Sequence, residues 1–444
     1  MLCRQHLHGA RLGILSWAGG AGGRIGGQAG LLGLLAIVAA DAARGEGFRN
    51  PPAGAFGLGR AGGRIAHVED ASAVAHNPAN LTRLQGPEAQ ASLMLVHLVA
   101  DYRSPAGATA RTRDPWKILP CTFAAVPFAQ GRWGLGFGVT VPFGLSILYP
   151  PDAAFRYTAP YHNDLKVINF NPTVFARLHD RLSVGAGVDV FYSRLSLRQI
   201  YPWLAFPGGG LGDPDGEMSL KGSGAGVGGN LGLTWEPVDG HRLAFTLRSP
   251  VEVNYEGDFH VSGLSAAGLA AGATPRSEMK TRIAFPTILG VGYGVELSKK
   301  LRFEVGFEWI QFSRFHSLAL NPGNNAVLFT GLGASPVIPQ NWRDTWTLGL
   351  AGDWKLGRDW TLLFGYQHYQ SPVPDRTFSP SIPDANQNAL TGGLAWRRGR
   401  HDLKVSYGAV LYDTRRLNNN LNPAFNGRWG MMVHLISAAY ACRF

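Results

Sequence analysis

Alternation of apolar and polar residues is the feature that most limits how this chain can fold. In the segment LRFEVGFEWIQF, residues 301–312, one face carries Leu301, Phe303, Val305, Phe307 and Trp309. The other face carries Arg302, Glu304, Gly306 and Glu308. Successive side chains of a strand point to opposite sides, so this period of two predicts strands with one apolar and one polar face. Segments 241–248 and 401–412 alternate in the same way. We expect the inward-facing Arg302, Glu304 and Glu308 to pair with one another across strands.

The connections between the predicted strands fall into two length classes. Six are short, at residues 129–131, 179–180, 237–240, 298–300, 357–358 and 398–400. Seven are long and rich in Pro, Gly and Asn, at residues 103–117, 143–166, 198–217, 256–280, 313–341, 370–387 and 415–425. Seven plus six connections, plus one, give fourteen strands. Short turns on one side and long loops on the other are typical of a transmembrane β-barrel and not of a soluble sandwich.

Composition and motifs exclude several other classes. Charged residues make up only 16% of the 444 residues, and the net charge of +11 is scattered without a dense basic block, so we expect no nucleic acid partner. Two G-x-G-x-x-G matches, at 57–62 and 224–229, lack the strand–turn–helix context of a dinucleotide site. The chain has no Walker A, G-x-S-x-G or H-E-x-x-H motif and no metal-ligand spacing. We therefore expect no enzyme activity, no cofactor and no metal.

The N-terminus has the pattern of an export signal. Residues 1–42 contain scattered arginines, an apolar run at 31–40 and a small-residue cleavage pattern at 40–42. The run is too short to span a bilayer as a helix, although a buried helix is the alternative reading. We predict a signal peptide at 1–42, with cleavage between 40 and 46. An exported chain of amphipathic strands that ends on Phe444 predicts the bacterial outer membrane.

Four segments carry a resemblance to the FadL family (OmpP1/FadL/TodX) of outer-membrane transporters of hydrophobic compounds. They are GLGRAGGRIAHVEDASAVAHNPANL (57–81), RWGLGFGVTVPFGL (132–145), LRSPVEVNYEG (247–257) and SPVPDRTFSPSIPD (371–384). The resemblance implies an all-β fold, a 14-stranded antiparallel transmembrane β-barrel over residues 88–444. It also implies a hatch, residues 43–87, that plugs the lumen, with Asp70, Asn77, Pro78 and Ala79 among its characteristic residues. A disordered leader before an open porin is the alternative for residues 43–87.

The resemblance also implies a function and partners. We expect passive transport of hydrophobic molecules, foremost long-chain fatty acids, through a lumen pocket and a lateral exit near the third strand. The alternatives are an aromatic-hydrocarbon channel of the same family, a general porin and an outer-membrane lipid enzyme. The expected partners are the hydrophobic substrate, outer-membrane lipid and lipopolysaccharide, and the expected state is a monomer. The choice between fatty acid and aromatic hydrocarbon cannot be made from the sequence.

Five residues are candidates for ligand binding. Phe48, close to the predicted cleavage region, is expected to reach the pocket as a hydrophobic finger, unless the terminus is disordered. Tyr201, Trp203 and Phe206 form an apolar cluster in a long loop, which is costly unless it binds something or packs on a neighbouring loop. Arg248 should face the lumen and needs an anion. That anion is a ligand carboxylate or, as we favour, an acidic hatch residue such as Glu69 or Asp70.

The third strand is the candidate for the lateral opening. It contains Gly136, Gly138, Pro142 and Gly144. Proline removes a donor from the strand ladder and glycine marks bulges, so the pattern predicts a gap in the wall there. A simple strand end at Pro142 is the alternative.

The two cysteines outside the predicted signal peptide are not expected to form a disulfide. Cys121 and Cys442 are too far apart in the predicted barrel.

Overall fold

A computed structural model describes residues 46–444 of the chain. The predicted signal peptide, residues 1–42, and the first three residues of the predicted hatch lie outside the described residues. Within the described part, no helix combines the length and apolar composition needed to cross a membrane.

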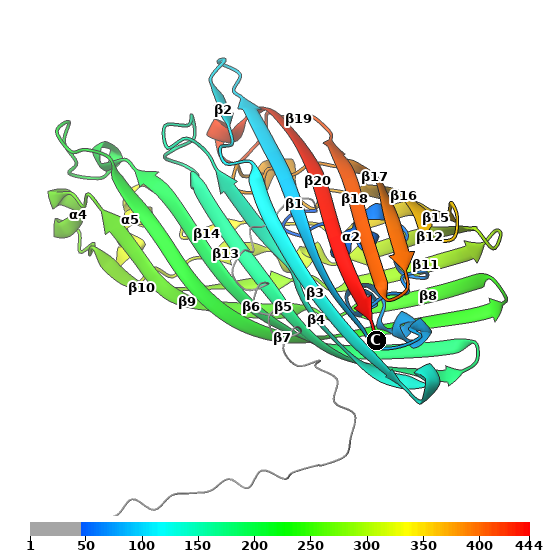
Figure 1. The fold of residues 1–444 in the computed structure, drawn as a ribbon. Coiled ribbons are helices and arrows are strands. Elements are labelled where there is room, and N and C mark those ends of the chain that lie inside the picture. The colour runs from blue at the N-terminus through cyan, green and yellow to red at the C-terminus, as the bar shows by residue number, and fades with distance from the viewer. Residues whose placement is uncertain (1–45) are drawn as a thin grey trace, which may run out of the picture.

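The described chain forms a closed antiparallel barrel in which each strand pairs with its neighbours and β1 closes on β20 (Figure 1). The wall segments are β1(Glu88–Arg103), β3(Trp116–Phe128), β4(Trp133–Leu148), β5(His162–His179), β6(Leu182–Tyr201), β7(Gly216–Val238), β8(His241–Arg248), β9(Val251–Ser262), β10(Arg276–Phe285), β11(Ile288–Glu296), β12(Leu301–Ile310), β15(Thr345–Lys355), β16(Trp360–Tyr369), β17(Gln387–Arg398), β18(His401–Tyr412) and β20(Gly427–Arg443).

Two of the spanning strands are each broken into two of these segments. β8 and β9 both pair with β7 and are separated by Ser249 and Pro250. β10 and β11 pair with β9 and β8 and are separated by Pro286 and Thr287. Proline has no N–H to give to the ladder, which explains both breaks. Sixteen segments minus two breaks give fourteen spanning strands, and the prediction of fourteen is confirmed.

Short elements occupy the hatch and the loops. The hatch contains α2(Gly54–Gly59), α3(Ala73–His76) and η1(Pro78–Arg83). The connections contain β2(Thr109–Arg111), η2(Ala129–Gly131), η3(Trp203–Ala205), α4(Ala266–Ala270), η4(Phe312–Arg314), β13(Ser317–Ala319), η5(Gly323–Asn325), α5(Ala326–Gly331), β14(Val337–Pro339), η6(Asp375–Thr377), β19(Arg415–Leu417) and η7(Pro423–Phe425). The tight turns lie at the end of the barrel that holds the C-terminus, and α4 and α5 lie at the opposite end (Figure 1). We call these the turn side and the loop side.

Side chains along the strands face alternately outward and inward, as the sequence predicts. On β12, Phe303, Val305 and Phe307 are exposed on the outer surface, whereas Glu304 and Glu308 are buried on the inner one. An apolar outer surface of this kind suits a lipid environment. The two cysteines of the described chain, Cys121 and Cys442, are free, which confirms that they do not form a disulfide.

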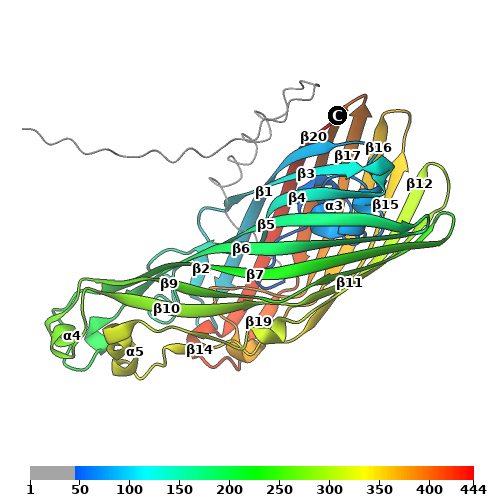
Figure 2. The ribbon, with the colours of Figure 1, turned by 90° about the horizontal axis from the view of Figure 1, so that it is seen from below.

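The described part of the hatch, residues 46–87, lies inside the barrel toward the turn side (Figures 1 and 2). Its fit depends on glycine at one close contact of two backbones. A Cβ on Gly349 of β15 would lie 2.2 Å from the Cα of Gly62, and Gly62 itself has a φ of +97°. A side chain at either position would push the hatch off the wall. The abundance of glycine in the hatch therefore serves its close approach to the strands.

The predicted hatch residues all contact neighbours in the lumen. Asn77 donates from Nδ2 to Ile65 O at 2.9 Å and to Thr234 Oγ1 at 3.0 Å, and its Oδ1 accepts from Ala79 N. Pro78 begins η1 and lies against glycines of β6 and β7. Asp70 pairs with Lys404 of β18 at 3.2 Å. Asn77 therefore holds the turn that the Asn-Pro-Ala sequence predicts.

Candidate functional site

Buried acids of β12 hold the hatch in place. Glu304 accepts hydrogen bonds from the backbone N–H groups of residues 65, 66 and 67 at 2.6, 2.8 and 3.0 Å, and from Arg60 at 3.4 Å. Glu308 accepts from Arg49 at 2.9 Å and from Arg64 at 2.7 Å. The acids on the wall are thus neutralised by donors from the hatch.

Our prediction that Arg302, Glu304 and Glu308 pair with one another is therefore wrong. Arg302 binds Asp353 of β15 at 2.9 Å and Glu69 of the hatch at 2.9 Å. A buried charge takes the partner whose geometry fits it best. Here the hatch supplies arginines and backbone N–H groups that the sequence pattern of the wall alone cannot show.

Two cavities lie in the lumen on the loop side of these contacts. The upper cavity has a volume of about 340 Å³ and is lined mostly by apolar side chains of the wall, including Leu145, Leu165, Leu195, Leu220, Phe259 and Ile283. Long-loop residues such as Ile338 and Phe425 cover it. Arg376, on the exposed surface of the loop before β17, is its one charged residue among the described lining residues. The volume falls in the range of small-molecule sites, ~300–1,000 Å³.

Phe48 lies at the boundary between the two cavities. Its ring lines the upper cavity, is only 1% exposed and stacks on Trp342 with 4.9 Å between ring centroids. It also makes edge contacts with Phe143, Phe285, Phe312 and Phe315. The next residues, Arg49 and Asn50, line the lower cavity. Phe48 therefore lies between the residues that line the upper cavity and those that line the lower cavity.

The barrel wall is incomplete beside the lower cavity. β3 and β4 pair only as far as Thr122 and Val139, so β4 beyond Val139 has no partner on β3. The pairing of β4 with β5 also shifts register between Thr140 and Phe143, which is a β-bulge. Pro142 lies within this bulge. The pairing of β3 with β1 continues up to Trp116, so the gap opens between β3 and β4 alone.

The hatch occupies part of the free edge of β4. Asn50 N donates to Pro142 O at 3.0 Å, and Gly144 N donates to Phe48 O at 2.8 Å. Asn50 Nδ2 also donates to Val141 O at 2.8 Å. The same short segment that places Phe48 between the cavities therefore pairs with the strand at the wall gap. Withdrawal of this segment would open both barriers at once.

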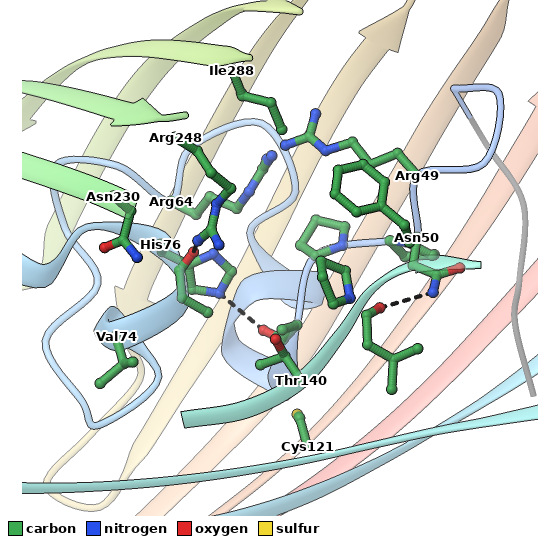
Figure 3. Close-up of a pocket in the computed structure, with 18 of the residues that line it drawn as sticks. Arg49, Asn50, Arg64, Val74, His76, Cys121, Thr140, Asn230, Arg248 and Ile288 are labelled. Atoms are coloured by element: carbon green, nitrogen blue, oxygen red, sulfur yellow. Dashed lines mark hydrogen bonds between the residues drawn. The ribbon is translucent and has the colours of Figure 1, made fainter. Parts of the chain in front are cut away.

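The lower cavity has a volume of about 120 Å³ and combines a charged side with an apolar side. Arg64, His76, Asn230 and Arg248 gather on one side in Figure 3. Met94 of β1, Leu119 of β3 and Val141 of β4 supply apolar lining. His76 binds the carbonyl oxygen of Ala53 through Nε2 at 2.9 Å. Burial and the nearby Arg64 lower the pKa of His76 to about 4, so its ring is neutral at pH 7.

The four residues predicted for the lateral opening have different positions. Pro142 is in the bulge, and Gly144 follows it on the free edge. Gly136 and Gly138 instead lie where β4 is paired on both sides. A Cβ at these two glycines would come within 2.9 and 3.0 Å of Val74 of the hatch. They make room for the hatch in a part of the wall that is closed. The prediction that Gly136 and Gly138 belong to the lateral opening is therefore wrong.

Tyr201, Trp203 and Phe206, the loop cluster that is a candidate for ligand binding, are all buried. Their rings contact one another. Tyr201 Oη donates to Leu328 O of the neighbouring long loop at 2.7 Å, and Trp203 packs on Gly268 of α4. None of the three lines the upper cavity. This cluster holds the long loops together, as the alternative reading anticipated.

Arg248 faces the lumen, but our favoured partners for it are wrong. Its guanidinium binds Asp189 of β6 at 2.5 Å and donates to Ala75 O of the hatch at 3.3 Å. Glu69 pairs with Arg242 and Arg302, and Asp70 with Lys404. Asp189 is on β6 and Arg248 is on β8. The alternation of residues along one strand does not show which residues of another strand lie next to it.

Several residues of the site carried no recognisable signal in the sequence. Arg49, Arg64 and Arg376 are isolated arginines in irregular segments. Asn230 follows a glycine-rich stretch in which alternation is weak. Proximity of Arg49 to Phe48 is the single clue that the sequence offers, because a finger that enters the lumen brings its neighbours with it.

Docking of the hatch segment beside Phe48 should depend on pH through the protonation of Glu46. Burial raises the pKa of Glu46 from 4.5 to about 7, although Arg49 opposes the shift. Glu308, Arg64 and Tyr369 are titratable groups that share this site. Asp384 is a further one, because it accepts from Gly47 N at 3.1 Å and burial raises its pKa. The docked segment then binds more protons than the undocked one, so docking is strongest below pH 4.5 and weakens as the pH rises to about 7.

We expect hydrogen exchange of the amides of residues 48–50, corrected for intrinsic rates, to quicken over this pH range in the wild type and to quicken clearly less in Glu46→Gln. The amide of Gly47 is left out, because it donates to Asp384, whose pKa is also raised. An equal pH dependence in both proteins would contradict the assignment to Glu46.

A closed barrel with an apolar outer surface and an internal hatch defines a transmembrane β-barrel protein of the outer membrane. The family described as "Outer membrane protein transport protein (OMPP1/FadL/TodX)" matches residues 36–444. The chain belongs to this family and is an outer-membrane protein.

Comparison with individual proteins agrees. The chain is 25% identical over 394 residues to the "Long-chain fatty acid transport protein" of Escherichia coli O6:H1, covering 82% of this chain and 86% of that protein. A Pseudomonas aeruginosa FadL homologue has the same fold, with a TM-score of 0.79, 21% identity and coverage of 90% and 100%. The toluene transporter TodX of P. putida has a TM-score of 0.71, 17% identity and coverage of 89% and 99%.

Proposed function

We propose that this protein carries long-chain fatty acids passively across the outer membrane. The observation that carries the proposal is the upper cavity, an apolar chamber with one charged residue, Arg376, in its lining. An amphiphile with one carboxylate and a long tail matches that distribution. The name of the Escherichia coli relative supports this substrate class, and the similarity to TodX keeps an aromatic hydrocarbon as the competing substrate.

The proposed route passes two barriers in order: the Phe48 ring between the cavities, and the hatch segment that pairs with β4 at the wall gap. The tail of a fatty acid enters the upper cavity from the loop side and contacts Phe48. Displacement of Phe48 and its neighbours then connects the upper cavity to the lower one. The ligand leaves through the gap between β3 and β4 into the membrane. No energy source is needed, because transport follows the concentration gradient.

Arg376 gives a test of the substrate class. We expect Arg376→Gln to weaken oleate binding by up to about fivefold, because an exposed ion pair contributes ~0.2–1 kcal/mol. Toluene carries no charge, so its binding should not change. Arg416→Gln is the matched control, because Arg416 is an exposed loop arginine outside the cavity lining.

Titration of the purified full chain with each ligand measures both affinities. Binding of toluene alone would replace the fatty acid with an aromatic hydrocarbon as substrate. Binding of neither ligand would refute the proposal.

A further inference from the structure

Asn230 is a buried amide without a partner in the lower cavity. Its side chain lines the cavity and its residue is only 4% exposed. Among the described residues, neither Oδ1 nor Nδ2 has a hydrogen-bond partner. Buried polar groups in proteins almost always have a partner. The free amide thus points to a polar group that enters this cavity.

Arg248 is directly across the strand pair from Asn230. The two residues are register partners on β8 and β7, so their side chains lie on the same face, with Cβ atoms roughly 5 Å apart. The guanidinium of Arg248 uses NH1 for Asp189 and NH2 for the carbonyl of Ala75. A guanidinium has further N–H donors. The pair can therefore offer donors to one acceptor from two directions.

The charges around the lower cavity favour an anion. Arg49, Arg64 and Arg248 line it, and the acids that face them are Glu46, Glu308 and Asp189. Glu46, with its pKa of about 7, is partly protonated at neutral pH. The group then carries a net positive charge in a site shielded from water, where electrostatic attraction is strong.

We propose that Asn230 and Arg248 form a binding site for the carboxylate head of the ligand in the lower cavity. Asn230 Nδ2 and the free N–H groups of Arg248 donate to the two carboxylate oxygens. The tail lies against the apolar lining residues Met94, Leu119 and Val141, which are on β1, β3 and β4. This inference rests on the proposed function and adds an orientation to it, because the tail enters the membrane first and the head last.

Photolabelling tests the position of the head. The probes are an oleate with a diazirine beside its carboxylate and the matching oleyl alcohol, each bound to the full chain in detergent. We expect the carboxylate probe to label the peptides that contain residues 230 and 248, and the alcohol to label them far less. Asn230→Leu keeps the volume and removes the amide. It should cut labelling of this site by the carboxylate probe about tenfold, the effect of one hydrogen bond to a charged group.

A double variant guards against misfolding. Arg248→Gln alone would leave the buried Asp189 carboxylate without its cation and with Asn169 as its remaining donor, so we combine it with Asp189→Asn. The double variant should fold and lose the preference for the carboxylate over the alcohol. Labelling of the upper cavity peptides with no labelling at residues 230 and 248, or equal labelling in Asn230→Leu, would overturn this site and leave the proposed function intact. Absence of labelling at either cavity would overturn both.

Discussion

Glu304→Gln should release the hatch and make the barrel conduct ions. Glu304 is 1% exposed and its carboxylate accepts from three backbone N–H groups of the hatch and from Arg60. Glutamine has the same size but places an NH₂ group, itself a donor, among these donors. The Arg60 guanidinium, also fully buried, loses one of its two anions and keeps Asp353 at 3.1 Å. Removal of one partner of a buried ion pair costs up to ~3–5 kcal/mol, and the remaining Asp353 places Arg60 below that limit.

Single-channel recording in planar bilayers measures the outcome. The wild type should pass little current, and Glu304→Gln should show long-lived open states. Glu252→Gln is the matched control, because Glu252 is half-exposed on the outer surface of β9 and pairs with Arg282 and Arg314 at the exposed surface. Each of these pairs contributes at most ~1 kcal/mol, so the control should remain closed. A closed Glu304→Gln channel in a folded barrel would show that Glu304 does not hold the hatch.

Deletion of Pro142 should close the wall gap and leave ligand binding in the upper cavity intact. Between the paired positions Thr140 and Phe143, β4 has two residues where β5 has one. Removal of one residue restores one-to-one pairing and keeps Phe143 on the inner face. The straightened β4 can then pair with β3 over residues 116–121. Pro142→Ala keeps the extra residue, so the bulge and the gap should persist in that control.

Oleate binding separates closure of the gap from damage to the cavity. The upper cavity is lined by residues above the bulge, such as Leu145, and by loops that the deletion does not touch. We expect the deletion variant to bind oleate within about threefold of the wild type, a change of less than ~1 kcal/mol. Loss of binding would mean that the deletion disturbs the barrel as a whole.

The sequence predicted the barrel well because its signals are local. Alternation sets which face of β12 is apolar, and the lengths of the connections set the number of strands. Pro142 could be singled out because proline breaks a ladder. Phe48 could be singled out because it follows the cleavage region closely and the family resemblance implies a pocket that the hatch N-terminus reaches. Each of these inferences uses neighbours in the chain.

The errors concern contacts between distant segments. Asp189 and Arg248 are 59 positions apart, and the wall acids Glu304 and Glu308 bind hatch donors more than 230 positions away. Tyr201 and Trp203 looked exposed because their covering loops come later in the chain. Gly136 and Gly138 looked like breaks in a strand because the hatch that needs the space is on another segment. Only the folded barrel brings these partners together.

Uptake of labelled oleate by cells that lack their own transporters of this kind tests the central claim most directly. Wild type, the Pro142 deletion and Pro142→Ala are compared at equal amounts of folded barrel in the outer membrane. If ligand leaves through the gap between β3 and β4, the wild type and Pro142→Ala take up oleate and the deletion variant falls to the background of cells without the protein. Uptake by the deletion variant at the wild-type rate would contradict the lateral route and direct the ligand through the hatch instead.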